Sequence, residues 1–301
     1  MKLIVNDKDL SQIYKSIQWS GDKKQRARSL SVSCLYKKGS GIPEVSIKNG
    51  DTIALYDDSQ AQRFLGIVTQ VQTSMAGVTV QVNARDILWY LGRNQVAKVY
   101  KGTADAILKG VCGDFNITVG KFPPLPGEKT VISTGEKTIY QVISEAYGNG
   151  YYIYADGAAV SVAEEGSEVV AVISGEGNLL EIQYSSSIEN MVNRIQILDE
   201  EGNVAGTVQN EEDLVYGLLQ GTYKKEKDKD AGKEAAAKLK RSENTCSLDC
   251  LGNWACVSGK AVYILDVSNG MLGKYVITDD THTFSDGIHK MKLSVEAVKT
   301  E

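Results

Sequence analysis

The chain has 301 residues, a formal net charge of −5 and a pI near 5.3. Its 42% hydrophobic and 24% charged residues are typical of a soluble globular protein, and its length predicts two or three domains. The acidic balance argues against a protein that reads nucleic acid, because neutralising phosphates requires a basic surface. No apolar run is long enough for a transmembrane helix, and no signal peptide follows Met1. We therefore expect a protein made in the cytoplasm, with no membrane partner and no sequence-specific nucleic acid partner.

The five cysteines predict buried, reduced thiols. Their odd number and the absence of a signal peptide argue against a disulfide framework, and their spacings do not match the paired two-residue gaps of zinc sites. Free cysteine packs readily as a small hydrophobic residue. We expect no metal and no cofactor. The five are Cys34, Cys112, Cys246, Cys250 and Cys256.

Residues 45–93 predict a three-strand meander, around which the rest of the chain is organised. Asn49-Gly50-Asp51 predicts a turn into a first strand, and a second strand runs from Phe64 to about Val71. Met75-Ala76-Gly77 turns the chain again, and β-branched residues then alternate with polar ones from Val78. A helix over residues 85–91, ending at Gly92, closes this segment.

The first 44 residues predict two strands, over residues 2–5 and 29–36. Between them, residues 18–22 predict a turn that follows Trp19, and residues 23–28 form a basic stretch. A basic cluster beside an aromatic residue is compatible with nucleic-acid contact, but no further basic stripe supports that interpretation. We expect a solvated loop that leads into a strand.

The middle of the chain predicts a small α+β segment. A helix follows the cap Thr103, with apolar residues at helical spacing from Ala104 to Cys112. A second helix starts at the capping box Thr138–Gln141, where a glutamine stands three residues after a threonine. An Asp-Gly turn then predicts a β-hairpin over residues 151–162.

Strands resume at about residue 178, including a long one predicted over residues 188–198, and a helix is predicted over residues 228–241. Acidic residues at the start of that helix and basic ones at its end match the helix dipole. Residues 254–298 then repeat the opening meander. Residues 257–264 parallel 48–55, Leu272-Gly273 parallels Leu65-Gly66, and Gly287 with the apolar positions after it parallels Gly77 and its strand. Two interpretations stay open: ordinary glycine turns of any meander, or two related β-barrel domains.

No catalytic constellation emerges from the sequence. The chain has only two histidines: His282 falls in a polar segment predicted as a turn, and His289 opens the last predicted strand. The acidic pairs Asp57-Asp58, Glu164-Glu165 and Asp279-Asp280 also fall in predicted turns, where solvation is the simpler account. We therefore expect no enzyme activity and no catalytic residue.

A series of short motifs, each weak alone, stands in one order along nearly the whole chain. They are Trp19-Ser20-Gly21-Asp22 with Arg28, Gly50-Asp51, Phe64-Leu65-Gly66-Ile67-Val68, Ala84-Arg85-Asp86-Ile87-Leu88, Thr103-Ala104-Asp105-Ala106-Ile107, Tyr216-Gly217-Leu218-Leu219-Gln220, Leu272-Gly273 and Asp280-Thr281-His282-Thr283-Phe284. In this order the chain resembles the baseplate hub proteins of contractile phage tails, of the late control protein D type, and is similar to the hub part of type VI secretion spike proteins.

The resemblance implies a β-rich α+β fold in which two related, tail-tube-like β-barrel domains flank an α+β insert. We accordingly expect a first barrel over residues 1–93, an insert of two helices and a hairpin over 94–177, and a second barrel over 178–301 that contains the helix at about 228–241. It also implies a homotrimer, in which two barrels per chain give a ring of pseudo-six-fold symmetry. Such a ring adapts the six-fold tail tube to the three-fold central spike.

The implied partners are the tail tube or tube-initiator protein, the central spike protein, the baseplate wedge proteins and, as a further candidate, a tape measure protein. The implied location is the baseplate of a phage tail or tail-like particle, after synthesis in the cytoplasm. Ten residues on the two meanders are our candidates for ring assembly: Leu65, Gly66, Val78, Val80, Val82, Leu272, Gly273, Met291, Leu293 and Val295.

Two other functions remain open from the sequence. A particle-associated cell-wall hydrolase would need a carboxylate pair or a histidine in a cleft. A glycan- or receptor-binding β module would use some of the 15 tyrosines.

Overall fold

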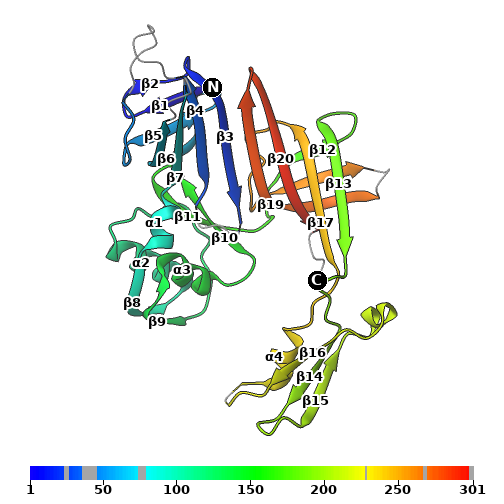
Figure 1. Cartoon of the computed structure of the whole chain (residues 1–301). Helices are drawn as coiled ribbons and strands as arrows, with labels where there is room; N and C mark the ends of the chain where they lie inside the picture. The colour runs from blue at the N-terminus through cyan, green and yellow to red at the C-terminus, as the bar shows by residue number, and fades with distance from the viewer. Residues whose placement is uncertain (24–26, 36–45, 74–78, 228, 267–269, 298–301) are drawn as a thin grey trace. The chain divides into compact units, whose positions relative to one another are not determined.

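The computed structural model describes residues 1–23, 27–35, 46–73, 79–227, 229–266 and 270–297. The chain divides into two compact units. Unit 1 contains Met1–Ile182 together with Ser247–Glu301, and unit 2 contains Gln183–Cys246. The protein is rich in β-structure, as the sequence predicts (Figure 1).

One large sheet joins strands from both ends of the chain. Its N-terminal strands, which we call the first half, are β1 (Lys2–Val5), β2 (Lys8–Asp9), β3 (Tyr14–Asp22), β4 (Ser29–Leu35), β5 (Thr52–Tyr56), β6 (Gln62–Thr73) and β7 (Thr79–Asp86). Its C-terminal strands, the second half, are β12 (Val169–Ser174), β13 (Leu179–Ser187), β17 (Glu243–Leu251), β18 (Ala261–Asp266), β19 (Met271–Ser285) and β20 (Ile288–Ala297). The order is β13-β17-β20-β19-β3-β4-β7-β6-β5-β1-β2, and β18 and β12 branch from β19.

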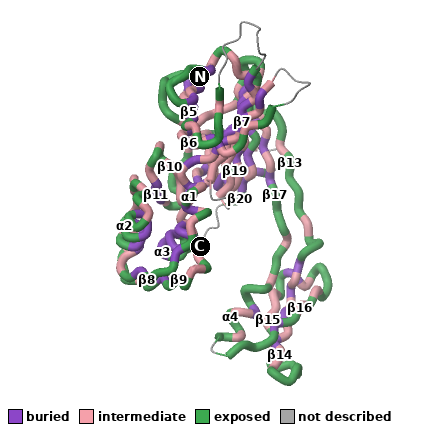
Figure 2. The backbone as a smooth tube through the Cα atoms, turned by 60° about the vertical axis from the view of Figure 1, so that its left-hand side comes forward, coloured by how far each residue is buried: buried purple, intermediate pink, exposed green. Residues whose placement is uncertain are grey.

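Along the strands of the first half, buried residues alternate with more exposed ones, as expected for a sheet with one buried face. On β4 the buried residues are Leu30, Val32 and Cys34, and on β7 they include Val80 and Val82. The second half repeats this alternation, with buried Cys246, Leu248 and Cys250 on β17 and Met291, Leu293 and Val295 on β20. Figure 2 shows this mixture of buried and exposed positions along the strands. All five cysteines are free and buried, which confirms the prediction of buried thiols outside disulfides.

The two halves share one hydrogen-bond pattern. Gly50 and Gly259 both have φ of +91°, and their N–H groups donate to Val68 O (2.8 Å) and Ile277 O (2.9 Å), respectively. The following strands then match residue for residue, because β5 pairs Thr52 with Ile67 while β18 pairs Ala261 with Val276.

The match extends to a β-bulge in each half. Thr69 is skipped in the β6–β7 ladder and Thr278 in the β19–β20 ladder. Both hydroxyls donate to a carbonyl on the neighbouring strand, Thr69 Oγ1 to Asn83 O (3.2 Å) and Thr278 Oγ1 to Ser294 O (3.1 Å). Bulges at the same place with the same side-chain bond make an accidental likeness of two meanders a poor explanation.

This register corrects part of the sequence alignment. The match of residues 257–264 to 48–55 agrees with the hydrogen bonds. The match of Gly273 to Gly66 is wrong, since Tyr275 holds the place of Gly66 when Thr278 is aligned with Thr69. Glycine spacing misled the alignment because the two glycines meet different local needs. Gly66 leaves room for the Arg85 carbonyl, whereas Gly273 adopts a positive φ of +141°.

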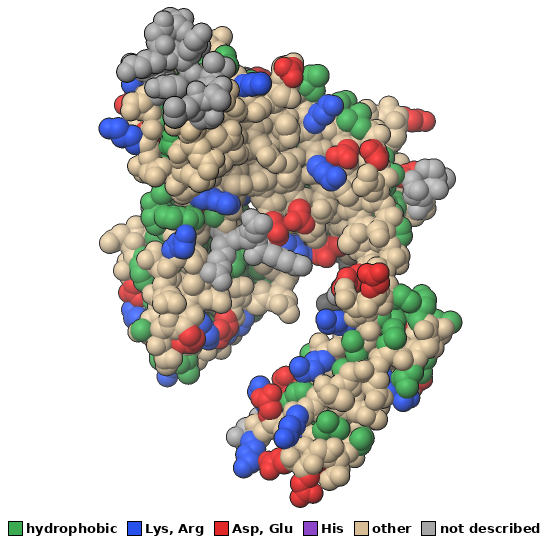
Figure 3. Space-filling view, in the orientation of Figure 1, with side chains coloured by type: hydrophobic (Ala, Val, Ile, Leu, Met, Phe, Trp, Pro, Cys, Tyr) green, Lys and Arg blue, Asp and Glu red, His purple; other side chains and the backbone are tan. Residues whose placement is uncertain are grey.

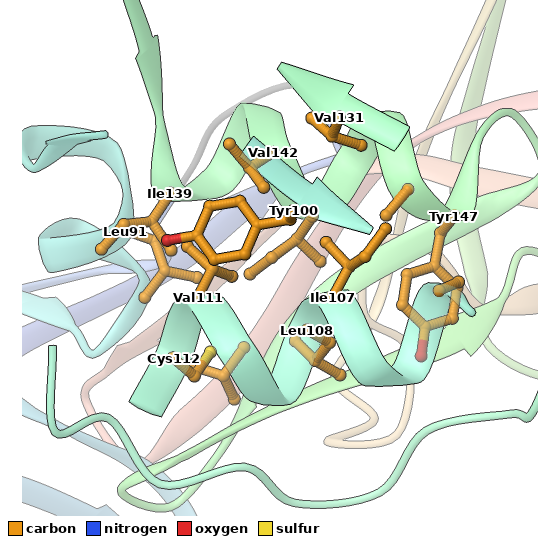
Figure 4. Close-up of a cluster of buried hydrophobic side chains, with 14 of the residues drawn as sticks. Leu91, Tyr100, Ile107, Leu108, Val111, Cys112, Val131, Ile139, Val142 and Tyr147 are labelled. Carbon is orange, nitrogen blue, oxygen red and sulfur yellow. The ribbon is translucent and has the colours of Figure 1, made fainter. Parts of the chain in front are cut away.

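An insert between β7 and β12 packs its own core in unit 1 (Figure 4). Its elements are α1 (Leu88–Arg93), β8 (Gln95–Gly102), α2 (Ala104–Asp114), β9 (Lys129–Thr138), α3 (Ile139–Tyr147), β10 (Tyr151–Asp156) and β11 (Ala159–Glu164). The predicted capping box is present, with Gln141 N donating to Thr138 Oγ1 and Thr138 N to Gln141 Oε1. The predicted hairpin is β10–β11.

Unit 2 is a small three-stranded sheet covered by one short helix. Its elements are β14 (Arg194–Leu198), β15 (Val204–Gln209), the 3-10 helix η1 (Glu212–Tyr216), β16 (Gln220–Lys224) and α4 (Ala231–Ala236). Its core consists of Ile195, Ile197, Tyr223 and Ala235. Along the chain, this unit lies between β13 and β17.

Several element boundaries differ from the predictions. The helix expected over 228–241 is α4 with only six residues, capped by Asp230, whose side chain accepts from Gly232 N and Lys233 N. The helix expected over 85–91 begins at Leu88, because Arg85 and Asp86 continue β7. The strand expected over 188–198 is shorter, because β14 begins only at Arg194. The predicted turn at residues 18–22 is wrong, because residues 14–22 form β3. The turn at residues 75–77 lies outside the described residues.

The close packing of β6 against β7 gives a test of the fold. A Cβ at Gly66 would lie 2.2 Å from the carbonyl oxygen of Arg85, a backbone atom that cannot move without displacing β7. We expect Gly66→Ala to lower the free energy of unfolding by about 3 kcal/mol, as overpacking does. Gly113→Ala is the matched control: a Cβ there meets nothing within 4 Å, and alanine in helix α2 should stabilise by about 0.5–1 kcal/mol. Urea denaturation followed by circular dichroism measures both. Equal effects of the two substitutions would contradict the packing described here.

Candidate functional site

The two halves of the sheet meet where β3 pairs with β19, and we call this junction the seam. The pairing is antiparallel and places His282 opposite Trp19, Thr281 opposite Ser20 and Asp280 opposite Gly21. Two of the sequence motifs that carry the family resemblance, although more than 250 residues apart, therefore lie side by side.

A buried ion pair lies at the centre of the seam. Arg28 donates through both terminal nitrogens to the Asp280 carboxylate, with Nη1 at 2.9 Å from Oδ1. The Asp280 side chain is fully buried and also accepts from Ser258 N at 2.6 Å. Because this bidentate pair is largely shielded from water, loss of either side chain would leave the other charge buried without a partner, which destabilises the folded state.

The chain around Arg28 is shaped to admit its guanidinium group. A Cβ at Gly21 would lie 2.3 Å from Arg28 Nη1, so only glycine allows this approach. The guanidinium carbon also lies 4.2 Å from the centroid of the Trp19 ring. Arg28 N donates to Asp86 Oδ2 at 3.2 Å, and burial raises the pKa of Asp86 to about 7.

Two histidines extend the seam with a fixed proton arrangement. His282 Nε2 lies 2.9 Å from Cys256 O, and a carbonyl can only accept, so Nε2 carries the proton. Neutral His282 then accepts at Nδ1 from His289 Nε2, also at 2.9 Å. Burial lowers the pKa of His289 to about 4, with a further lowering by His282, and burial also lowers the pKa of His282.

Aromatic rings surround these groups. Trp254 stacks on Phe284 with centroids 4.5 Å apart, and His289 stacks on the same phenylalanine at 4.1 Å. Trp19 lies 4.9 Å from His282 and 5.7 Å from Trp254. The seam is therefore an aromatic cluster around one ion pair, which suits a structural joint.

The structure corrects the earlier interpretation of His282 and Asp280. Neither lies in a turn: both are inside β19 and fully or almost fully buried. The prediction that His289 begins the last strand is confirmed.

A cleft of about 370 Å³ opens beside the seam, and two of the cations that line it are already ion-paired, although Trp19 Nε1 and Arg28 Nε at its edge have no hydrogen-bond partner. Among the cations that line it, Arg63 contacts Asp57 at 2.6 Å and Lys260 contacts Glu168 at 2.9 Å. Within the described residues, no group of three or more histidine, cysteine or acidic side chains could hold a metal ion. No described helix is both long and apolar enough to cross a membrane.

The ten assembly candidates from the sequence do not all lie at one place. Val80 and Val82 on β7 and Met291, Leu293 and Val295 on β20 are buried beneath the sheet, at matching positions of the two halves. Leu65, Gly66, Leu272 and Gly273 lie on β6 and β19, where Leu272 is exposed, and Val78 is outside the described residues.

Sequence reasoning missed the clearest signal of the repeat. Ile17-Gln18-Trp19-Ser20 on β3 corresponds to Ile182-Gln183-Tyr184-Ser185 on β13. The hydrogen bonds support this register, because Leu35 N donates to Ile13 O and Leu251 N donates to Asn178 O at the matching ends. A comparison of the strands before each meander, instead of the meanders alone, would have found it.

The comparisons with known proteins agree with this architecture. A model of the YQBQ-like family matches residues 17–296. The chain belongs to the YQBQ-like family. No match was found among the curated proteins.

Solved structures with the fold of this YQBQ-like chain include phage tail proteins. The 43 kDa tail protein of prophage MuSo2 from Shewanella oneidensis has a TM-score of 0.76 at 15% identity, covering 98% of this chain and 96% of that one. The tail protein from Neisseria meningitidis MC58 has a TM-score of 0.71 at 13% identity, over 98% and 95%.

A secretion-system protein shares the fold as well. The E. coli c3393 protein has a TM-score of 0.61 at 10% identity, over 99% of this chain and 77% of that one. It is described as a component of the type VI secretion system with structural similarity to T4 bacteriophage tail proteins gp27 and gp5. These likenesses confirm the hub-like fold that the sequence resemblance implied.

The ion pair of the seam gives a direct test. Asp280→Ala leaves Arg28 buried without its partner, and we expect the free energy of unfolding to fall by about 3–5 kcal/mol. Asp249→Ala is the matched control, since Asp249 faces Lys292 at 3.9 Å on the surface and should change stability by less than about 0.5 kcal/mol. Thermal and urea unfolding measure both. A loss for Asp280→Ala no larger than that of the control would show that the seam does not depend on this pair.

The histidine pair predicts how stability depends on pH. The folded pKa of His289 lies below the ordinary value of 6.5, so the unfolded chain binds more protons between about pH 6.5 and 4. The contribution of His289 is therefore complete above pH 6.5 and is lost as the pH falls towards 4. We expect the urea midpoint of the natural protein to fall over this range, and that of His289→Gln to fall less. Parallel curves for the two proteins would contradict the assignment.

Proposed function

We propose that this chain is the structural baseplate hub of a contractile tail or a phage-tail-like particle. In this proposal the hub adapts the six-fold tail tube to the three-fold central spike. The names of the similar solved structures support it, since two are tail proteins and one is a type VI secretion component. The hub would be made in the cytoplasm and assembled into the baseplate.

One observation carries the proposal: the sheet repeats one strand order and, among the described residues, leaves an open edge along β13 and another along residues 70–73 of β6. The first half runs β3-β4-β7-β6-β5 and the second half runs β13-β17-β20-β19-β18. Matching hydrogen bonds and bulges support the same correspondence. We therefore infer two related, tail-tube-like barrel domains, over residues 1–93 and 178–301, with the α+β insert at 94–177.

The open edges are complementary. Within the described residues, positions 70–73 of β6 pair only with β7, whereas the matching part of β19 also pairs with β3. The strand that corresponds to β3 is β13, which stands at the end of the strand order beside β17 in the part of the chain that the structure describes. An unpaired edge offers a row of backbone donors and acceptors to another chain. A second copy can thus add its β13 to β6, as β3 adds to β19 within one chain.

Repetition of this contact closes a ring. Each chain supplies two equivalent positions, so three chains give six, which is what a homotrimeric adaptor between six-fold and three-fold neighbours needs. The buried assembly candidates would support the ring wall from beneath, namely Val80, Val82, Met291, Leu293 and Val295, and Leu65, Gly66, Val78, Leu272 and Gly273 would lie along the strands that approach it. The proposed partners are the tail tube or tube-initiator protein, the central spike, the wedge proteins and a tape measure protein.

The rival functions have less support. A hydrolase requires an acidic pair or a histidine open to substrate, but Asp280 is ion-paired and His282 is fully buried. His289 lines a cleft of about 260 Å³ together with Asp58, but its Nε2 already bonds His282 and the Asp58 carboxylate accepts from the Met1 amino group. A glycan- or receptor-binding module would use tyrosines, and Tyr152 and Tyr154 line the cleft beside the seam. A glycan-binding assay that returns nothing would weaken this alternative.

The register of the seam predicts which residues meet across copies. Thr281 faces Ser20 within the chain, and the corresponding residues are Gln72 on β6 and Ser185 on β13. We expect Gln72→Cys with Ser185→Cys to form disulfides between copies, giving covalent trimers on non-reducing gels. The control is Gln72→Cys with Tyr184→Cys, in which a shift of one residue turns the thiols to opposite faces.

Two outcomes would contradict the ring. Equal cross-linking by both pairs would mean that the copies collide without this register. Failure of both pairs in purified particles, where the ring must be closed, would rule out the β6–β13 contact. Electron microscopy of the same particles would show whether density for the chain lies between the tube and the spike.

A further inference from the structure

Unit 2 exposes a cluster of apolar side chains on one loop, residues 210–219, which we call the display loop. It contains η1 and the motif Tyr216-Gly217-Leu218, which take no part in the proposed contact between β6 and β13. Val215 is 80% exposed, and Tyr216 and Leu218 are each 53% exposed. Figure 3 shows hydrophobic side chains gathered at one end of this unit. Contiguous exposed apolar surface, rimmed by charge, is typical of an interaction site.

The loop is held in shape by one fully buried residue, Asn193. Its Nδ2 donates to Asp213 O at 3.0 Å and to Gly217 O at 2.7 Å, and its Oδ1 accepts from Leu219 N at 2.9 Å. Its backbone adds two bonds, donating to Leu219 O and accepting from Asn210 N, both at 2.9 Å. The side chain thus binds the beginning and the end of the loop at once.

Further bonds fix the middle of the loop. Asp213 is buried and accepts from Asn210 Nδ2 at 2.8 Å, and Arg241 Nε lies 3.3 Å from its carboxylate. Arg241 Nη2 donates to Glu212 at 2.7 Å, and Gly217, with φ of +88°, ends η1 by donating to Leu214 O. The apolar side chains are therefore presented by a preorganised loop, which reduces the entropy lost when a partner docks.

The charge around the display loop selects the kind of partner. Glu211 and Glu212 are exposed beside Val215, and Arg241 is the one cation that the described residues place against these acids. Contact between two copies of the loop would bring these carboxylates together, and like charges facing one another in an interface are costly. A surface with an apolar pocket and a basic rim would complement both features.

We propose that the display loop docks into an apolar pocket, rimmed by lysine or arginine, on a protein other than this chain. Tyr216 is the anchor, because a tyrosine supplies a large contact area with little side-chain entropy to lose and is enriched at binding hot spots. Val215 and Leu218 flank it, and Glu211 pairs with the rim, since Glu212 is already paired with Arg241. This proposal rests on the proposed hub function in one respect, namely that the partner is expected in the same particle.

A photoreactive side chain at the anchor tests this. Tyr216 is replaced by p-benzoyl-phenylalanine in the full chain, expressed in cells that assemble the particle, and adducts formed on irradiation are identified by mass spectrometry. The positional control carries the same group at Glu201, in the turn between β14 and β15, since the ladder from Arg194–Gln209 to Leu198–Val204 puts this turn at the opposite end of the sheet from Asn193. The charge control adds Glu211→Lys alone to the photoreactive chain, because Glu212 is paired with Arg241, which holds the loop.

We expect an adduct with one different protein from position 216, none with that protein from position 201, and a loss of about tenfold or more on charge reversal. An adduct only with a second copy, no adduct, or an adduct that charge reversal leaves unchanged would overturn the proposal. If purified particles lack the chain, the proposed hub function fails instead. In that case the adducts from positions 216 and 201 and the effect of charge reversal are measured in irradiated intact cells. These three results still test whether the display loop docks on a different protein.

Discussion

The ion pair between Arg28 and Asp280 is the interaction on which the arrangement of the sheet depends. It joins residues from opposite ends of the chain at the point where the two halves become one sheet. Charge is stable there because the site is closed: Asp280 is fully buried, Ser258 donates to it, and Trp19 covers the guanidinium group. The buried face of the sheet already disfavours a shift of one residue, and the bidentate pair adds a fixed geometry to that register.

The same constraint explains the unusual residues nearby. Gly21 is small because Arg28 occupies the space that a side chain would need. His282 is neutral because it is fully buried, and its hydrogen bonds to the partly buried His289 and to the Cys256 carbonyl leave one consistent arrangement of protons. Asp280 and His282, which a search for catalysis would single out, are here the components of a joint. Burial of these two side chains is the physical reason, since a base without access to substrate can only contribute structure.

The two edges of the repeat differ from the closed seam in their exposure. Trp19 is 3% exposed where β19 covers it, while Tyr184, at the corresponding place on β13, is 58% exposed. This difference is what a closed contact within a chain and an open contact awaiting another chain would produce. The display loop of unit 2 presents apolar groups in a different way, through a hydrogen-bonded loop instead of a strand edge. The two surfaces therefore suit different partners.

The sequence by itself determined the local elements whose cause is local. The capping box at Thr138, the Asp-Gly hairpin and the alternation of β7 depend on neighbours within a few residues, and all three are present. The order of the resemblance motifs also led to the β-rich, hub-like fold that the similar solved structures share. Individual turns and helix ends were less certain, as α4 illustrates: its apolar stripe is too thin to support more than six residues against the unit 2 sheet.

Only the tertiary structure decided which distant residues meet. The polar run from Asp279 to Thr283 has the composition of a turn, and nothing within it indicates that Arg28 and Trp19 will enclose it. The repeat was visible in the sequence, but glycine positions gave the wrong register, because hydrogen bonds and bulges fix register and glycines follow local strain. The pairing of β3 with β19 joins residues more than 250 positions apart, so neither strand can be assigned its neighbour from its own short stretch of sequence.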